Sequence, residues 1–160
     1  MSTQRLFLDL EGTVIVSWDD QRLINLDTTR ALIAHQCVDE LHIFSAAIWN
    51  EADKRSFERE LKPRLEDALD MPILSWVSME EVWKNTPWAT VKFDSVCELV
   101  SVIGKRLMYY EWCKATQKTD CLLLDDSFQT ESLVTSQQTI AILNIDEWRT
   151  AYEQVHGNLQ

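Results

Sequence analysis

The segment RLFLDLEGT, at positions 5–13, is a short apolar run that ends abruptly in two carboxylates, a glycine and a threonine. An apolar run of this length, without alternation and bounded by a turn signal, is typical of a strand buried on both faces. Ligands of open α/β sheets bind just outside the carboxyl ends of such strands. Asp9 and Glu11 therefore lie where a site is expected, and the rest of the chain must supply their partners.

Further apolar runs alternate with helix-forming segments along the chain. Strands are predicted at residues 41–44, 73–77, 121–124 and 139–143. Helices are predicted at residues 27–37, 50–69 with an interruption at Pro63, 78–84, 95–103, 105–116, 131–136 and 146–155, and a small hairpin at residues 14–26. This alternation predicts an α/β fold with a mainly parallel sheet and right-handed crossovers. We expect a Rossmann-like three-layer sandwich around a five-stranded sheet, as one domain over residues 1–160.

Polar residues at the expected helix ends predict the caps. Asp27 or Thr28 is expected to cap the first helix, and Asp146 the last. Ser78 and Glu81 have the spacing of a capping box. A dinucleotide-binding domain is excluded, because it needs a glycine-rich turn after the first strand and a single glycine stands there.

The composition limits the classes of function. Apolar residues make up 46% of the chain and charged residues 26%, which predicts a soluble globular protein. No apolar run approaches the roughly 20 residues that a membrane span needs, and the N-terminal residues lack a signal-peptide pattern, so a cytoplasmic location is expected. The net charge of −11 argues against long nucleic acids as partners, because an acidic surface repels phosphates. None of the four cysteines forms a CxxC pair, so reduced core thiols are expected.

Polar side chains follow three of the predicted strands, and a lysine begins one of the predicted helices. These residues are Asp9, Glu11, Ser45, Asp125, Asp126 and Lys105. A group of carboxylates repels itself unless a hard cation lies among them, and oxygen ligands suit Mg²⁺. A hydroxyl and an ammonium suit a phosphoryl oxygen, and the turn from Leu10 to Thr13 can direct backbone N–H groups at the same anion. The pattern predicts a site that stabilises a transferring phosphoryl group.

These motifs resemble those of the haloacid dehalogenase-like (HAD) phosphatases. That family has an apolar strand followed by DxD, a strand ending in Ser or Thr, a lysine, and a strand ending in an acidic pair. The matching segments are Asp9-Leu10-Glu11-Gly12-Thr13, His42-Ile43-Phe44-Ser45, Gly104-Lys105 and Leu124-Asp125-Asp126. The order of the motifs agrees over nearly the whole chain.

The resemblance implies a role for each matching residue. Asp9 would be the nucleophile that forms an aspartyl phosphate, and Glu11 would protonate the leaving oxygen and then activate water. The phosphoryl oxygens would be held by Ser45, Lys105 and the backbone of Leu10, Gly12 and Thr13. The magnesium ligands would be Asp9, the backbone carbonyl of Glu11 and Asp126, with Asp125 beside them.

Glu11 departs from the family pattern, and the position of the lysine is open. Glu11 replaces the usual second Asp, as in the similar enolase-phosphatase branch, and reaches one methylene further. Lys105 is our choice for the phosphate-site lysine, while Lys92 and Lys118 lie in the same interval and stay open as alternatives. A metal-bound structure of the site would identify the lysine.

The segments between the motifs are too short to hold a second domain, so we expect no large cap over the site. A cap normally closes over a small substrate and excludes water. Without one, the site is open to a large substrate or is covered by loops or a second subunit. The tryptophans of the predicted loops can form the rim of such a site; they are Trp18, Trp49 and Trp88.

The sequence leads to two hypotheses of different classes. The first is a Mg²⁺-dependent phosphatase, a phosphoric monoester hydrolase, whose substrate is a small phosphorylated metabolite, a nucleotide or a phosphoprotein. Phosphoryl transfer to another acceptor is a variant of the same chemistry. The second hypothesis is a catalytically impaired HAD-fold protein that acts as a protein-binding module, which Glu11 and the acidic, tryptophan-rich composition suggest.

Overall fold

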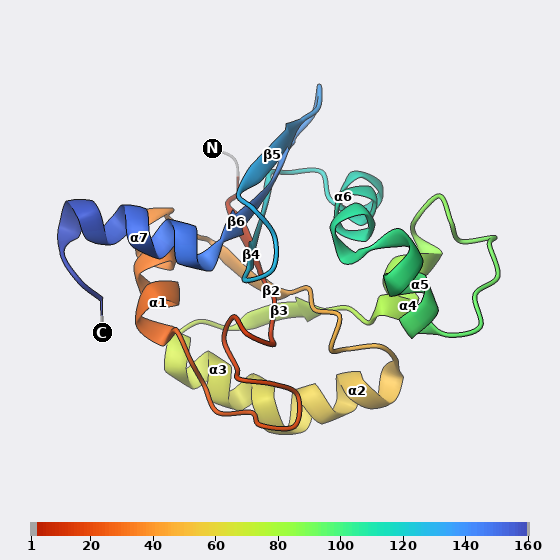
Figure 1. The fold of residues 1–160 in the computed structure, drawn as a ribbon, viewed down its shortest axis with the longest axis horizontal. Helices are drawn as coiled ribbons and strands as arrows, with labels where there is room; N and C mark the ends of the chain where they lie inside the picture. The colour runs from red at the N-terminus through yellow and green to blue at the C-terminus, as the bar shows by residue number, and fades with distance from the viewer. Residues whose placement is uncertain (1–2, 160) are drawn as a thin grey trace.

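The computed structural model describes residues 3–159, and one sheet runs through its centre (Figure 1). Within these residues the sheet has six strands, namely β1 (Arg5–Leu8), β2 (Glu40–Ile43), β3 (Ile73–Trp76), β4 (Cys121–Asp125), β5 (Glu131–Val134) and β6 (Thr139–Asn144). Their order across the sheet is β3-β2-β1-β4-β6-β5. Neighbouring strands are parallel except for β5 and β6, which are antiparallel. The protein therefore has an α/β fold with a mostly parallel sheet.

Helices cover both faces of this sheet. They are α1 (Leu26–His35), α2 (Glu51–Ser56), the π-helical turn η1 (Phe57–Leu61), α3 (Lys62–Leu69), α4 (Met79–Lys84), α5 (Val96–Ile103), α6 (Lys105–Thr116) and α7 (Ile145–His156). Helices α1, α3 and α7 pack on a core that includes Leu32 and Leu65. Helices α4, α5 and α6 pack on a second core that includes Leu99 and Tyr109. Figure 1 shows the two groups of helices on opposite sides of the sheet, as in a three-layer sandwich.

The position of β1 explains why the opening apolar run lacks alternation. Leu6 and Leu8 belong to the first core and Phe7 to the second, so consecutive side chains are buried on opposite faces. β1 pairs with β2 on one side and with β4 on the other. The prediction of a strand buried on both faces is confirmed.

The segment at residues 131–136 is a strand followed by a turn, so the prediction of a helix there is wrong. β5 pairs with β6 in a hairpin that projects from the edge of the sheet (Figure 1). The N–H of Thr135 donates to the Gln138 carbonyl at 2.9 Å, and its hydroxyl accepts the N–H groups of Gln137 and Gln138. The local sequence does not reveal this strand, because pairing with β6 stabilises it. In the described residues the sheet therefore has six strands instead of the expected five.

The first and last helices begin one or two residues earlier than predicted. Asn25 precedes α1, so Asp27 lies in its first turn and Thr28 is buried within it. Asn144 precedes α7, and its side chain accepts the N–H of Asp146 at 3.0 Å. Asn144, the last residue of β6, thus caps α7 in place of the predicted Asp146, whereas the Asn25 side chain makes no capping hydrogen bond to α1. The predicted capping box of α4 is present at Ser78 and Glu81.

The connection between β1 and α1 is a hairpin-like loop with little regular strand. Ile15 and Leu23 form an isolated antiparallel bridge, and the Val16 N–H donates to the Arg22 carbonyl at 3.1 Å. This agrees with the small hairpin predicted there. The next long connection also differs in detail, because α2 continues through η1 into α3 and Pro63 lies in the first turn of α3 instead of interrupting the helix.

Two of the four cysteines are buried and two are exposed. Cys113 and Cys121 are buried free thiols, but Cys37 and Cys97 are exposed, so the expectation of core thiols is wrong for these two. Within residues 3–159, every helix is too short or too polar to cross a membrane.

Candidate active site

Three neighbouring strands bring their carboxyl ends together at one edge of the sheet. β1 lies between β2 and β4, with Leu8 opposite Ile43 on one side and Leu124 on the other. Because these strands are parallel, the residues that follow them meet at the same edge. The carboxylates of Asp9 and Asp125 and the hydroxyl of Ser45 consequently line one cleft.

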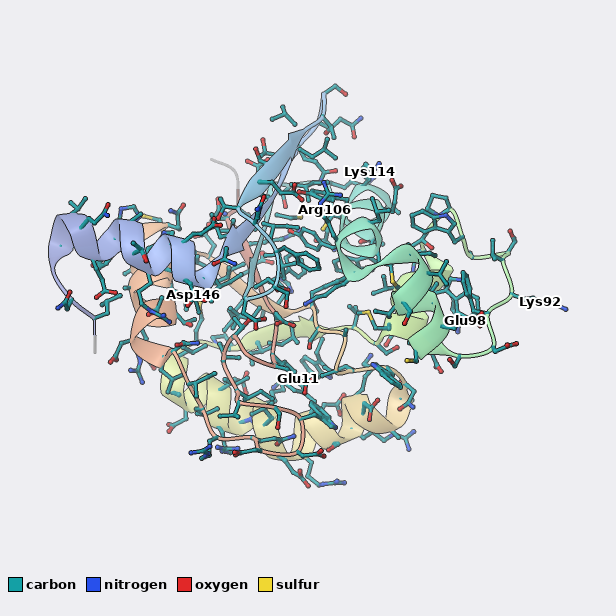
Figure 2. All side chains as sticks on the ribbon, viewed as in Figure 1. Glu11, Lys92, Glu98, Arg106, Lys114 and Asp146 are labelled. Carbon is teal, nitrogen blue, oxygen red and sulfur yellow. The ribbon has the colours of Figure 1, made fainter. Side chains whose placement is uncertain are left out.

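Lys105 joins the carboxylates of two strands. It begins α6, and its Nζ donates to Asp9 Oδ1 and to Asp125 Oδ2, each at 2.6 Å. The lysine side chain and both carboxylates are almost fully buried. Lys92 and Lys118 are exposed, and Figure 2 shows Lys92 on an outer loop, far from the central sheet. Of the three lysines considered from the sequence, Lys105 is the one that the fold places among the acids.

Burial and neighbouring charges set the protonation of this cluster. Burial raises the pKa of Asp9 to about 6, although the Lys105 ammonium opposes this change. Burial alone lowers the pKa of Lys105, but the carboxylates of Asp9 and Asp125 outweigh it and hold that pKa above its usual value. At neutral pH the ammonium is therefore charged and Asp9 is largely ionised. An ionised carboxylate in a water-poor site is suited to act as a nucleophile.

The loop after β1 uses part of its backbone for its own structure. The Gly12 N–H donates to the Ile15 carbonyl at 2.8 Å, and the Thr13 N–H donates to the Leu10 carbonyl at 3.1 Å. Both N–H groups are thus bonded within the loop, and the predicted binding of a phosphoryl oxygen by Gly12 and Thr13 would require these bonds to break. The Thr13 hydroxyl instead donates to Asp9 Oδ2 at 3.0 Å and so orients the carboxylate.

Gly12 is required by the close approach of this loop to Asp126. Its φ of +74° is in the left-handed region, which favours glycine. A Cβ at this position would lie 2.1 Å from Asp126 Oδ2. A side chain at position 12 would therefore displace the Asp126 carboxylate and would also strain the backbone.

The three aspartates form a group with the chemistry of a cation site. Oxygen atoms of Asp9, Asp125 and Asp126 all lie within 4.8 Å of one another. Carboxylate oxygens are hard donors that suit Mg²⁺ and Ca²⁺. Within the described residues the group consists of Asp9, Asp125 and Asp126, and the Glu11 carboxylate does not belong to it.

The side chain of Glu11 is exposed and is held by the loop. Its Oε2 accepts the backbone N–H of Trp18 at 2.8 Å. Glu11 nevertheless lines the same cleft as Asp9 and Lys105, and Figure 2 shows it on the loop beside the centre of the sheet. The Glu11 residue therefore borders the cleft while its carboxylate is bonded to the loop.

The cleft itself has a volume of about 370 Å³. Its polar lining includes Ser45, whose hydroxyl accepts the Ala47 N–H at 3.2 Å and keeps its own proton for a ligand. Val100 from α5 and Phe128 from the loop after β4 form apolar parts of the wall. Neither residue can be predicted as a site residue from the sequence, because an apolar side chain in a helix or loop carries no signal that it borders a site.

Two of the three loop tryptophans border a smaller neighbouring cavity. Trp18 and Trp49 line it together with Glu11, and its volume is about 220 Å³. Trp88 lines neither this cavity nor the cleft. Its carbonyl accepts the Trp83 indole N–H at 2.7 Å, which gives it a structural contact elsewhere. The expectation of tryptophans beside the site therefore applies to Trp18 and Trp49.

Comparison with protein-family models, with curated proteins and with solved structures finds no match for this chain. The class of site is thus defined by the fold and the side chains alone. The protein has an α/β fold, and in its candidate site a buried lysine joins two aspartates at the carboxyl edge of a mostly parallel sheet.

Proposed function

We propose that this protein is a Mg²⁺-dependent phosphatase that works through an aspartyl phosphate on Asp9. The observation that carries the proposal is the cluster in which Lys105 Nζ donates to Asp9 and Asp125 at 2.6 Å, beside Ser45 in one cleft. A carboxylate nucleophile, an ammonium and a hydroxyl are the groups that phosphoryl transfer through a covalent intermediate needs. The four-motif resemblance to the HAD-like phosphatases supports the same conclusion.

The proposed reaction has two steps. In the first, an Asp9 oxygen attacks phosphorus, the bond from phosphorus to the leaving oxygen breaks, and Glu11 gives its proton to that oxygen. The products are a free alcohol and the aspartyl phosphate. In the second, the Glu11 carboxylate takes a proton from water as the water oxygen attacks phosphorus. The bond from phosphorus to Asp9 breaks, and inorganic phosphate leaves.

The positions of the remaining residues support their proposed roles. Thr13 and Lys105 hold the two oxygens of Asp9, so the nucleophile is already oriented when the substrate arrives. Lys105 and the Ser45 hydroxyl are placed to hold phosphoryl oxygens. For the first step Glu11 must release the Trp18 N–H and turn toward the leaving oxygen, which its longer side chain permits.

The three aspartates fit Mg²⁺, since their oxygens lie within 4.8 Å of one another. Asp9 and Asp126, with the backbone carbonyl of Glu11, would hold the ion, and Asp125 would stand beside them. When bound, Mg²⁺ supplies positive charge that neutralises the phosphoryl group and the approaching carboxylate.

The connections of the sheet support a HAD-like protein without a large cap. The link from β1 to α1 holds only the hairpin-like loop. The helices between β2 and β4 include members of both cores, so they belong to the layers that cover the sheet. We therefore propose a cleft that is bordered by loops.

Hydrolysis of p-nitrophenyl phosphate with and without Mg²⁺ tests the proposal. We expect turnover that requires the metal and that Asp9→Asn abolishes, since an amide cannot form the acyl phosphate. Asp67→Asn, at an exposed position of α3, is the matched control and should retain activity. If wild type and Asp9→Asn show equal turnover across a broad panel of phosphate esters, the proposal is wrong.

One observation favours the second candidate, a protein-binding module without catalysis. The Glu11 carboxylate is bonded to the loop and lies outside the group of three aspartates. Calorimetry with Mg²⁺ and beryllium fluoride separates the candidates. Binding of the phosphoryl mimic that requires Asp9 supports the enzyme, or a transferase that uses the same residues. Absence of metal binding, with a stable partner recovered in pull-downs, supports the module.

A further inference from the structure

The small cavity next to the cleft has a composition that the proposed hydrolysis does not require. It is lined by Glu11, Trp18, Ala47, Trp49 and Asp53. Two of these residues, Glu11 and Ala47, also line the cleft that contains Asp9. The small cavity and the cleft therefore adjoin each other at Glu11 and Ala47.

The two tryptophans come from separate segments, and each is tied to an acid. The backbone N–H of Trp18 donates to the Glu11 carboxylate at 2.8 Å. The backbone N–H of Trp49 donates to Asp53 Oδ2 at 3.0 Å, at the beginning of α2. Trp49 is 42% exposed, so an indole surface is open to a ligand. Backbone hydrogen bonds thus hold the two tryptophan residues close to the two acids that line this space.

The charge of this space selects its occupant. Among the described residues its lining contains two acids, Glu11 and Asp53, and no base, and Asp53 is the acid that takes no part in the proposed proton transfer. The nearest lysine in sequence, Lys54, forms an ion pair with Glu81 at 2.7 Å. Indole faces and carboxylates both attract cations, and a quaternary or primary ammonium between them gains from both. A second phosphate or a carboxylate of the substrate would be repelled.

We infer that this cavity binds an ammonium group on the alcohol part of the substrate, so that the substrate is a small phosphate ester of an amino alcohol. The inference rests on the proposed phosphatase function, because the phosphoryl group must lie at Asp9 in the adjoining cleft. The volume of about 220 Å³ also favours a small head group, since pockets for larger organic ligands span about 300–1,000 Å³. A nucleoside or a peptide would extend well beyond it.

A matched pair of substrates tests the inference. Choline phosphate and 3,3-dimethylbutyl phosphate have nearly the same shape, but only the first carries a positive charge on its alcohol part. We expect kcat/KM to favour choline phosphate by about tenfold, as a partly desolvated cation–π site predicts. Trp49→Leu and Asp53→Asn should each reduce this preference by at least half. Trp88→Leu, which removes a tryptophan outside both cavities, should leave it unchanged.

The outcomes separate this inference from the proposed function. If p-nitrophenyl phosphate is hydrolysed with dependence on Asp9 but the two esters react equally, the cation site is wrong and the phosphatase stands. Equal loss of preference in Trp88→Leu and Trp49→Leu also overturns the inference. If no ester is hydrolysed, the substrate assignment is wrong together with the phosphatase. Calorimetry with choline chloride and with 3,3-dimethylbutanol then decides the cation site by itself, and equal binding of the two rejects it.

Discussion

Replacement of Lys105 by methionine gives the most direct test of the buried cluster. The lysine is almost fully buried, and its Nζ donates to Asp9 and to Asp125 at 2.6 Å. Methionine retains an unbranched side chain that fills similar space but removes the charge and both hydrogen bonds. The variant therefore leaves two buried carboxylates without the cation that compensates them.

The expected loss follows from these contacts. A hydrogen bond to a charged group contributes about 1.5–3 kcal/mol, and removal of one partner from a buried ion pair costs about 3–5 kcal/mol. We expect Lys105→Met to lower the free energy of unfolding by about 3–5 kcal/mol, since the two carboxylates share one lysine and their effects overlap. Lys118→Met, at an exposed site, should change it by less than about 0.5 kcal/mol.

Urea unfolding followed by circular dichroism measures this loss. The measurement belongs at pH 8 with EDTA, where Asp9 is ionised and divalent cations are removed. A cycle with Asp125→Asn isolates the charge effect. The double variant Lys105→Met/Asp125→Asn should be more stable than the sum of the single losses predicts, because it removes one of the unpaired charges together with the lysine.

Two results would refute this reasoning. One is a loss below about 1 kcal/mol for Lys105→Met, which would mean that solvent compensates the aspartates. The other is strict additivity in the cycle, which would mean that the lysine and Asp125 do not interact. Either result would show that Lys105 does not stabilise the aspartates as the proposed site requires.

Three further predictions concern other parts of the structure. Gly12→Ala should destabilise the protein by more than the roughly 1–2 kcal/mol of a left-handed alanine and should weaken Mg²⁺ binding, because its Cβ would lie 2.1 Å from Asp126 Oδ2; Gly157→Ala, with φ +85° and open space around it, is the control, and equal thermal shifts would contradict the clash. Burial lowers the pKa of His42 below 6.5, so the unfolded chain binds this proton more tightly and stability falls as pH drops below about 6.5; urea titrations should show a smaller fall from pH 7.5 to 5.5 in His42→Gln, and parallel curves would reject this account. Ser78→Ala removes the hydroxyl of the capping box and should cost about 1 kcal/mol in chemical denaturation, whereas an unchanged midpoint would show that the cap does not contribute.

Much of the fold follows from local patterns in the sequence. Apolar runs without alternation identify β1 and β4, because strands that are buried on both faces need apolar residues at consecutive positions. The predicted helix at residues 105–116 coincides with α6, and the capping box of α4 is at its predicted place. These features depend on residues close together in the chain. β5 does not, because its residues become a strand only through pairing with β6, and the sequence therefore predicted a helix there.

The candidate site divides in the same way. The apolar runs of the sequence already show that Asp9 and Ser45 follow buried strands and that Asp125 comes at the end of one, and parallel pairing then makes them neighbours. The sequence did not determine which lysine meets them, because Lys105, Lys92 and Lys118 all lie between the second and fourth strand motifs. The fold answers this question, because it packs the beginning of α6 against the ends of β1 and β4 so that an ammonium lies between two buried carboxylates.

The orientation of the loop after β1 also came only from the tertiary structure. Its sequence indicated a turn with a glycine, but not that the N–H groups of Gly12 and Thr13 would bond within the loop, or that Glu11 would accept the N–H of Trp18. The sequence determines which residues reach the edge of the sheet, because runs of consecutive apolar residues identify the strands that are buried on both faces. Where each group then points depends on contacts between segments far apart in the chain, and those contacts exist only once the chain has folded.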